Sequence, residues 1–164
     1  MSTIDLSGKT AIVTGGGRGL GRAMALALAE AGANVCAATY LPEDIDKLQA
    51  DGEGLAGRVM AIETDIRDVE DCARAVHGTI DTFGGLDILV NNAGVGMALI
   101  SDSFTRDPVK FWDIEPATWR RIIDTNFTGA FQMAREATPH LLEKGWGRIV
   151  NITTSIPTMQ RRGY

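Results

Sequence analysis

The 164-residue sequence is poor in the residues that build metal centres and disulfide frameworks. It contains two cysteines, Cys36 and Cys72, and two histidines, His77 and His140. The cysteines form no Cys-x-x-Cys pair, and the histidines stand alone, so the spacing typical of metal ligands is missing. We therefore expect buried thiols, surface histidines and no metal site.

Long hydrophobic runs and an excess of positive charge are also missing. No apolar stretch reaches membrane-spanning length, and the N-terminus lacks the pattern of a signal sequence. The net charge of −5 disfavours a nucleic-acid partner or an anionic membrane surface. These features predict one cytoplasmic domain over residues 1–164, without nucleic-acid or membrane partners.

Short apolar runs alternate with helical patterns along the whole chain. The runs are mostly continuous, as in strands that are covered on both faces, and they lie at 10–14, 34–39, 59–64, 86–91 and 148–153. Strands that alternate with helices favour βαβ units and a parallel sheet. The sequence therefore predicts the α/β class.

Helical spacing of apolar residues predicts three helices between these strands, with a weaker fourth over Pro42–Ala50. The first lies over Leu20–Ala31. The second spans Val69–Phe83, with Asp68 as its N-cap and a glycine pair as its stop. The third and longest runs from Pro116 to Gly145, with its apolar stripe over 119–141. Residues 95–115 lack periodicity but are apolar, which indicates either a substrate-side wall or lid, or a surface loop packed on itself.

A glycine-rich turn, Thr14-Gly-Gly-Gly-Arg-Gly-Leu-Gly21, joins the first strand to the first helix. A helix start offers unpaired N–H groups to a phosphate, and glycines let the phosphate approach the backbone. An NTPase P-loop would need lysine and a hydroxyl where Arg22 and Ala23 stand, and Gly-x-Gly-x-x-Gly would need glycine at Leu20. The pattern that fits is Thr-Gly-x-x-x-Gly-x-Gly, which indicates nucleotide binding.

Four further motifs follow this turn in order. They are Asp65-Ile66, Asn91-Asn-Ala-Gly94, Asn126 in the long helix, and 147–155 along the fifth strand. In order and spacing, the whole set resembles the short-chain dehydrogenase/reductase family. The resemblance implies a Rossmann-type doubly wound parallel sheet with strand order 3-2-1-4-5, lacking the last strands of the family fold. It also implies that the chain is the N-terminal portion of a longer NAD(P)-binding protein.

The resemblance implies a role for each motif. The glycine turn would hold the pyrophosphate, Asp65 would accept from the adenine amino group, and Ile66 would lie against the adenine ring. Asn126 would interrupt the long helix and anchor a water for proton relay, although a buried, hydrogen-bonded amide is the alternative. The expected cofactor site comprises Gly15, Arg18, Gly19, Leu20, Gly21, Thr39, Tyr40, Asp65, Ile66, Asn91, Asn92, Ala93 and Gly94.

Whether the site prefers NAD(H) or NADP(H) depends on which residue stands at the end of the second strand. An acidic residue there would bind the adenosine ribose and repel a 2′-phosphate, but this chain has Thr39. Together with Arg18, that hydroxyl favours NADP(H). Glu43 and Asp44 follow closely, and if they fold back they would favour NAD(H).

The catalytic groups implied by the resemblance are a serine hydroxyl and a Tyr-x-x-x-Lys pair. The hydroxyl aligns with Thr154, or with Ser155 if the strand end shifts by one residue. Tyr164 lies ten residues after Thr154 and is the last residue, so no lysine follows it. We expect the catalytic tyrosine to lie beyond it.

Two functions remain open at this point. One is an alcohol dehydrogenase or carbonyl reductase that uses NADP, or NAD, on a small alcohol or ketone, and that is catalytically incomplete as these 164 residues. The other is a non-catalytic dinucleotide-binding module. The long helix resembles one that family members use for subunit contacts, which implies a homodimer or homotetramer.

Overall fold

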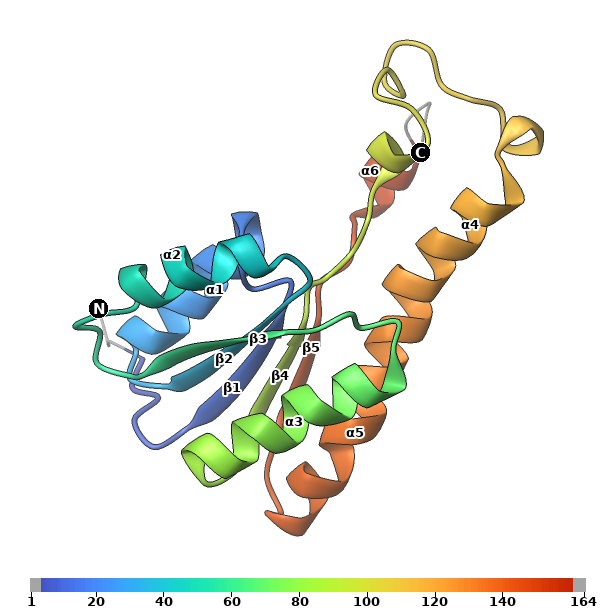
Figure 1. Cartoon of the computed structure of the whole chain (residues 1–164). Helices are drawn as coiled ribbons and strands as arrows, with labels where there is room; N and C mark the ends of the chain where they lie inside the picture. The colour runs from blue at the N-terminus through green and yellow to red at the C-terminus, as the bar shows by residue number, and fades with distance from the viewer. Residues whose placement is uncertain (1–3, 161–164) are drawn as a thin grey trace.

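A five-stranded parallel sheet with helices on both faces forms the body of the protein (Figure 1). In the computed structural model, which describes residues 4–160, the strand order is β3-β2-β1-β4-β5. The strands are β1 (Thr10–Thr14), β2 (Asn34–Thr39), β3 (Val59–Glu63), β4 (Ile88–Asn91) and β5 (Arg148–Asn151). The predicted fold class and strand order are confirmed.

The strands alternate their side chains between two hydrophobic clusters. Ala11 and Val13 of β1 pack toward α1 (Gly19–Glu30), while Ile12 between them joins the cluster of α3 (Val69–Phe83) and α5 (Ala130–Glu143). Burial on both faces explains why these strands read as continuous apolar runs. The sheet is therefore the middle layer of three (Figure 1).

Local signals fix the ends of α3. The Asp68 carboxylate accepts hydrogen bonds from the backbone N–H groups of Glu70 (2.8 Å) and Asp71 (3.0 Å). The helix ends at Gly84, whose φ of 84° is left-handed. Both ends lie where the capping residues predicted them.

The long C-terminal helix is interrupted around Asn126, as the resemblance implied, but its burial differs from the prediction. It consists of α4 (Pro116–Ile123), a π-helical segment η4 (Asp124–Gly129) and α5. Its stripe is also only half buried: Ile122, Ala137 and Leu141 enter the core, whereas Trp119 and Phe127 are exposed. The five-residue hydrogen-bond step of a π-helix rotates the helix face, so spacing counted at 3.6 residues loses its register there.

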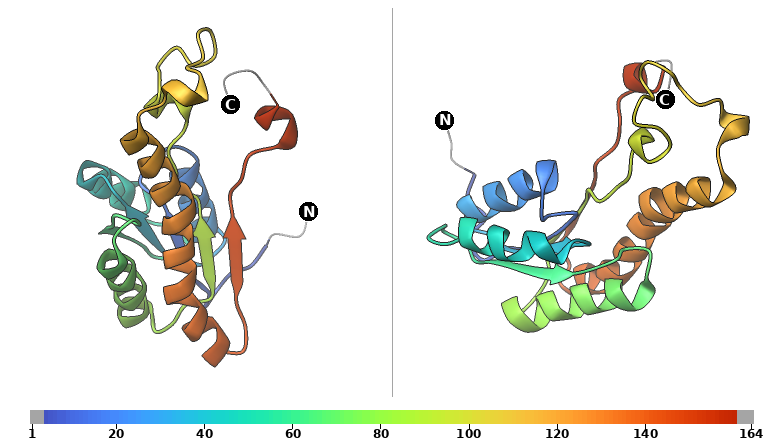
Figure 2. Two further views of the ribbon diagram at one scale, coloured as in Figure 1. Left: turned by 90° about the vertical axis from the view of Figure 1, so that its right-hand side faces the viewer. Right: turned by 45° about the horizontal axis from the view of Figure 1, so that its top comes forward.

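The weaker predicted helix is a 3-10 turn η1 (Pro42–Asp44) that leads into α2 (Ile45–Asp51). The region 95–115 contains two further 3-10 turns, η2 (Met97–Leu99) and η3 (Phe111–Asp113), and it extends with α6 (Ile156–Met159) beyond the carboxyl ends of β4 and β5 (Figure 2). The sequence did not predict α6. Among residues 4–160, no helix is both long and apolar enough to cross a membrane.

Candidate functional site

A cleft of about 350 Å³ opens at the carboxyl end of the sheet. It lies where β2 and β4 leave β1 on opposite sides, the point of an open α/β sheet at which ligands bind. Residues of four strand ends line it. They are Gly15, Arg18, Leu20, Gly21, Ala38, Thr39, Tyr40, Leu41, Asp44, Thr64, Asp65, Ile66, Arg67, Asn92, Ala93, Gly94 and Val95, with Arg121 and Thr125 from the long helix.

The glycine turn forms one wall of the cleft. The Gly15 N–H donates to the Ala38 carbonyl at 2.7 Å, which ties the turn to β2. No side chain of the described residues caps the start of α1, so its first N–H groups are available to a ligand. Gly19, the first residue of α1, has a left-handed φ of 54°. The turn thus presents the backbone donors and the positive helix end that favour a phosphate.

Thr14 fixes the opposite wall. Its hydroxyl accepts hydrogen bonds from the backbone N–H groups of Asn92 and Ala93, both at 3.0 Å, and its carbonyl accepts from the Asn92 side chain at 3.0 Å. The threonine before the glycine turn therefore holds the end of β4 beside it. Thr14 was not among the residues expected in the site.

Asn91 lies beneath the cleft and does not line it. Its Nδ2 donates to the Ala130 carbonyl at 3.3 Å and to Asn151 Oδ1 at 3.0 Å. Asn91 thus links β4 to α5 and β5. Asn126 is also outside the cleft lining, but its side chain bonds the backbone of Val95, which lines it. Asn126 is exposed, so the burial expected under the alternative is wrong, but its amide is hydrogen-bonded as that alternative required.

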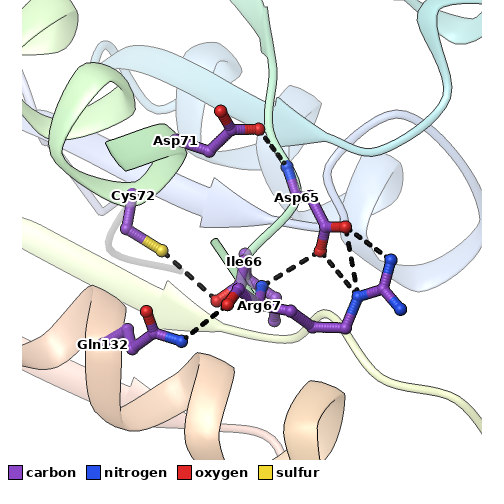
Figure 3. Close-up of polar contacts among 6 residues, drawn as sticks. All are labelled: Asp65, Ile66, Arg67, Asp71, Cys72 and Gln132. Atoms are coloured by element: carbon purple, nitrogen blue, oxygen red, sulfur yellow. Dashed lines mark hydrogen bonds and ion pairs between the residues drawn. The ribbon is translucent and has the colours of Figure 1, made fainter. Parts of the chain in front are cut away.

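Asp65 and Arg67, which both line the cleft, form an ion pair (Figure 3). The Asp65 carboxylate accepts from Arg67 Nε at 2.8 Å and from the Arg67 backbone N–H at 3.0 Å. The Arg67 guanidinium also lies 5.7 Å from the centre of the Tyr40 ring. Hydrogen bonding to Arg67 lowers the pKa of Asp65 against the opposing effect of burial, so the carboxylate stays ionised.

The backbone around this pair is held by α3 and α5. The Asp65 N–H donates to Asp71 Oδ2 at 2.9 Å, and the Arg67 carbonyl accepts from Gln132 Nε2 at 3.1 Å (Figure 3). The Cys72 thiol donates to the Ile66 carbonyl at 3.3 Å. Ile66 itself is buried, and it lines the cleft.

Arg18 and Thr39 are both engaged within the protein. Arg18 pairs with Asp44, at 2.6 Å from Nε to Oδ2, and with Glu43, at 3.5 Å. Thr39 is only 3% exposed. Glu43 and Asp44 therefore fold back onto the glycine turn. From the sequence, this arrangement was the one expected to favour NAD(H) over NADP(H).

The two candidate hydroxyls differ in their surroundings. Ser155 caps α6: its Oγ lies 2.9 Å from Thr158 Oγ1 and accepts from the Thr158 N–H at 3.4 Å. Thr154 is exposed and makes no hydrogen bond with the described residues. Neither lines the cleft, and Tyr164 lies outside the described residues.

The cleft thus collects all of the expected cofactor residues except Gly19 and Asn91. It adds five polar residues that the expected site did not include: Asp44, Thr64, Arg67, Arg121 and Thr125. The spacing of Arg121 and Thr125, four residues apart on a helix, was a signal for a shared face. Outside the cleft, His77 and His140 pack edge to face at 5.9 Å. No group of metal-binding side chains occurs among residues 4–160.

Comparison with known proteins gives matches along nearly the whole chain. The short chain dehydrogenase family profile matches residues 9–164. D-beta-hydroxybutyrate dehydrogenase of Rhizobium meliloti (strain 1021) is 38% identical, over 90% of this chain and 54% of its own length. The 3-oxoacyl-(acyl-carrier-protein) reductase FabG of Vibrio cholerae is 35% identical, over 98% of this chain and 60% of its own length.

Solved structures agree with these sequence matches. The structure of 7 alpha-hydroxysteroid dehydrogenase complexed with NADH and 7-oxo glycochenodeoxycholic acid superposes with a TM-score of 0.81 at 30% identity. The superposition covers 93% of this chain and 55% of that one. The chain therefore spans between half and two thirds of the length of these relatives.

Proposed function

The chain belongs to the short-chain dehydrogenase family, and from that premise we propose that its cleft binds a nicotinamide dinucleotide for hydride transfer to or from an alcohol or carbonyl substrate. One observation carries the proposal. A single cleft at the switch point of the sheet joins the glycine turn, Asp65 and the Asn92–Gly94 segment. These groups come from three strand ends far apart in the sequence, and each suits a different part of a dinucleotide.

The residues of the cleft would divide the cofactor between them. The N–H groups at the start of α1, beside Gly15 and Gly21, would hold the pyrophosphate. The Asp65 carboxylate would accept from the adenine amino group, with Ile66 against the ring. Because Asp65 already holds Arg67, adenine would share that carboxylate with the guanidinium.

A bound nicotinamide would supply or accept the hydride, and the protein would have to exchange a proton, or provide a hydrogen bond, at the substrate oxygen. We assign the hydrogen bond to Thr154, because the Ser155 hydroxyl is engaged by Thr158. Asn126 would act in proton relay beside the cleft. Within the 164 residues, no tyrosine has a lysine four positions later: Tyr40 is followed there by Asp44.

We therefore propose that these 164 residues bind the cofactor without reducing carbonyls. A tyrosine with a neighbouring cation has its pKa lowered from about 10 toward neutrality, and neither Thr154 nor Ser155 can supply such an acid. A non-catalytic dinucleotide-binding module is the second function that this observation favours.

The test is a titration of the protein with NADH and NADPH, followed by fluorescence of the reduced nicotinamide, together with an assay of cofactor oxidation on a panel of ketones and aldehydes. Binding with no oxidation is the expected result for these residues alone. Oxidation that is lost in Tyr164→Phe would show that Tyr164 is the catalytic acid. Failure of both dinucleotides to bind would overturn the proposed function.

Three finer assignments accompany this function. The expectation of NADP(H) required a free Arg18, and its pairing with Asp44 supports NAD(H) instead. The exposed apolar side chains of Trp119, Ile123, Phe127 and Phe131, which lie along α4, η4 and α5, support a homodimer or homotetramer. A small alcohol or ketone as substrate and a cytoplasmic location remain predictions from the sequence.

A further inference from the structure

We infer that Asp44 makes the cleft select NAD(H) over NADP(H), because it holds the guanidinium of Arg18 that a 2′-phosphate would need. This inference rests on the proposed dinucleotide site. Arg18 meets Asp44 through two parallel hydrogen bonds, Nε to Oδ2 at 2.6 Å and Nη2 to Oδ1 at 3.0 Å. Fork-to-fork pairing of this kind is the geometry in which arginine binds a phosphate.

The position of Asp44 is built into the fold. Pro42 starts the η1 turn, and the Asp44 N–H donates to the Leu41 carbonyl at 3.1 Å. A Cβ on Gly17 would lie 2.8 Å from Asp44 Cβ, so the η1 turn is in direct contact with the glycine turn, which requires glycine there. The Asp44 side chain is 17% exposed, against 58% for Arg18. The carboxylate is thus the fixed partner and the guanidinium the adaptable one.

The charged groups around Arg18 disfavour the binding of a 2′-phosphate. One guanidinium, that of Arg18, faces the two carboxylates of Glu43 and Asp44. A phosphate would have to displace Asp44 from Arg18 and then remain beside both acids. A ribose hydroxyl, in contrast, can donate to a carboxylate. Asp44 lines the cleft next to Thr39, so it supplies an acid where the end of β2 has none.

The experiment compares the dissociation constants of NADH and NADPH for the unmodified protein, for Asp44→Asn and for Glu43→Gln/Asp44→Asn. The unmodified protein should bind NADH more tightly. Asp44→Asn should move the ratio about tenfold toward NADPH, as expected when one charge-assisted contact becomes available. The double variant should move it further, and Arg18→Ala added to Asp44→Asn should remove the gain.

A matched control lies one turn further along α1. Arg22 of α1 forms an ion pair with Asp51 of α2 through Nη2 and a single carboxylate oxygen, but neither Arg22 nor Asp51 lines the cleft. Asp51→Asn should leave the ratio unchanged. Thermal unfolding of each variant checks that the fold is intact.

The outcomes separate the inference from the proposed function. If both dinucleotides bind and NADPH is preferred by the unmodified protein, or Asp44→Asn leaves the ratio unchanged, the inference is overturned and the function stands. An equal shift in Asp51→Asn also overturns it. If neither dinucleotide binds, both fail.

Discussion

The side-chain amide of Asn126 forms two hydrogen bonds with the backbone of Val95. Its Oδ1 accepts from the Val95 N–H at 2.7 Å, and its Nδ2 donates to the Val95 carbonyl at 2.8 Å. Asn126 lies in the π-helical segment η4, whereas Val95 follows Gly94 at the mouth of the cleft. The amide thus satisfies both polar groups of a residue outside regular structure and fixes the loop that leaves β4.

Replacing Asn126 should loosen this loop. Asn126→Leu removes both hydrogen bonds, and Asn126→Asp removes the donor while placing a negative charge against the Val95 carbonyl. We expect each to weaken dinucleotide binding several-fold, since about 1 kcal/mol is lost per hydrogen bond. Hydrogen exchange should show faster exchange of the Val95 amide in both variants. Unchanged protection at Val95 would mean that the loop is held by other contacts.

Gly19→Val should abolish dinucleotide binding. Gly19 has φ of 54°, and a side chain there would stand at the helix start that we assign to the pyrophosphate. Gly54 has φ of 78° and, as at Gly19, a Cβ added there would meet no atom within 4 Å, but Gly54 precedes β3 at the amino end of the sheet, whereas Gly19 begins α1 at the carboxyl end. Gly54→Val should therefore cost the same strain, about 1–2 kcal/mol, with binding retained. Equal loss of binding in both variants would mean that strain, rather than blocked access, is the cause.

The surroundings of Asp87 predict that the stability of the folded protein depends on pH. It is buried, and burial alone would raise its pKa, but hydrogen bonds from Lys144 and the Thr10 N–H, with Lys9 nearby, hold the pKa below its usual 3.8. A carboxyl whose pKa is lower in the folded state stabilises the fold above its unfolded pKa and loses that effect as the pH falls through the folded value. The free energy of unfolding should thus be level from neutral pH down to about 5 and fall below about 4.

Asp87→Asn isolates this contribution. It should lower the free energy of unfolding at pH 7 by about 1–3 kcal/mol, because both lysines are partly exposed and can be resolvated. It should also flatten the decline at acid pH. Urea unfolding from pH 3 to 7 measures both effects, with Asp51→Asn as the control for an exposed ion pair. A variant as stable as the parent at pH 7 would contradict the assignment.

The sequence predicted the elements whose signals are local. The bounds of β1, β2 and α3 agree with the structure because apolar runs, the Asp68 cap and Gly84 act within a few residues. The resemblance implied an interruption at Asn126, but residue spacing did not predict a π-helical segment there or the tertiary hydrogen bonds of Asn126 with the Val95 backbone. For the same reason the expected burial of Trp119 and Phe127 was wrong.

The candidate site shows the same division. The glycine turn, Asp65 and Asn92–Gly94 were identifiable because each follows a predicted strand. The pairing of Arg18 with Asp44 depends on the path of the η1 turn, and the pairing of Asp65 with Arg67 depends on rotamers. Because such ion pairs depend on tertiary structure, they could not be predicted from the sequence. Only their consequences for cofactor binding could be stated in advance.

The exposed stripe on the long helix predicts self-association. Trp119, Ile123, Phe127 and Phe131 succeed one another at intervals of four residues along α4, η4 and α5, with exposures of 57, 36, 75 and 61%. Monomeric proteins rarely expose a row of four large apolar side chains on one helix to solvent. A second copy of this helix would cover it with the same residues, as a two-fold interface requires.

Phe127→Ser/Phe131→Ser should therefore shift the protein toward monomer. Sedimentation over a range of concentrations should give a dissociation constant at least about tenfold higher, because each buried phenylalanine contributes roughly 1.5–3 kcal/mol. Ile4→Ser is the control, since Ile4 is 75% exposed but lies outside the stripe. Because Phe127 lies next to Asn126 in η4, dinucleotide binding should be measured in parallel. Loss of association with binding retained would place the interface on the outer face of the helix, whereas a monomeric parent protein would refute the prediction.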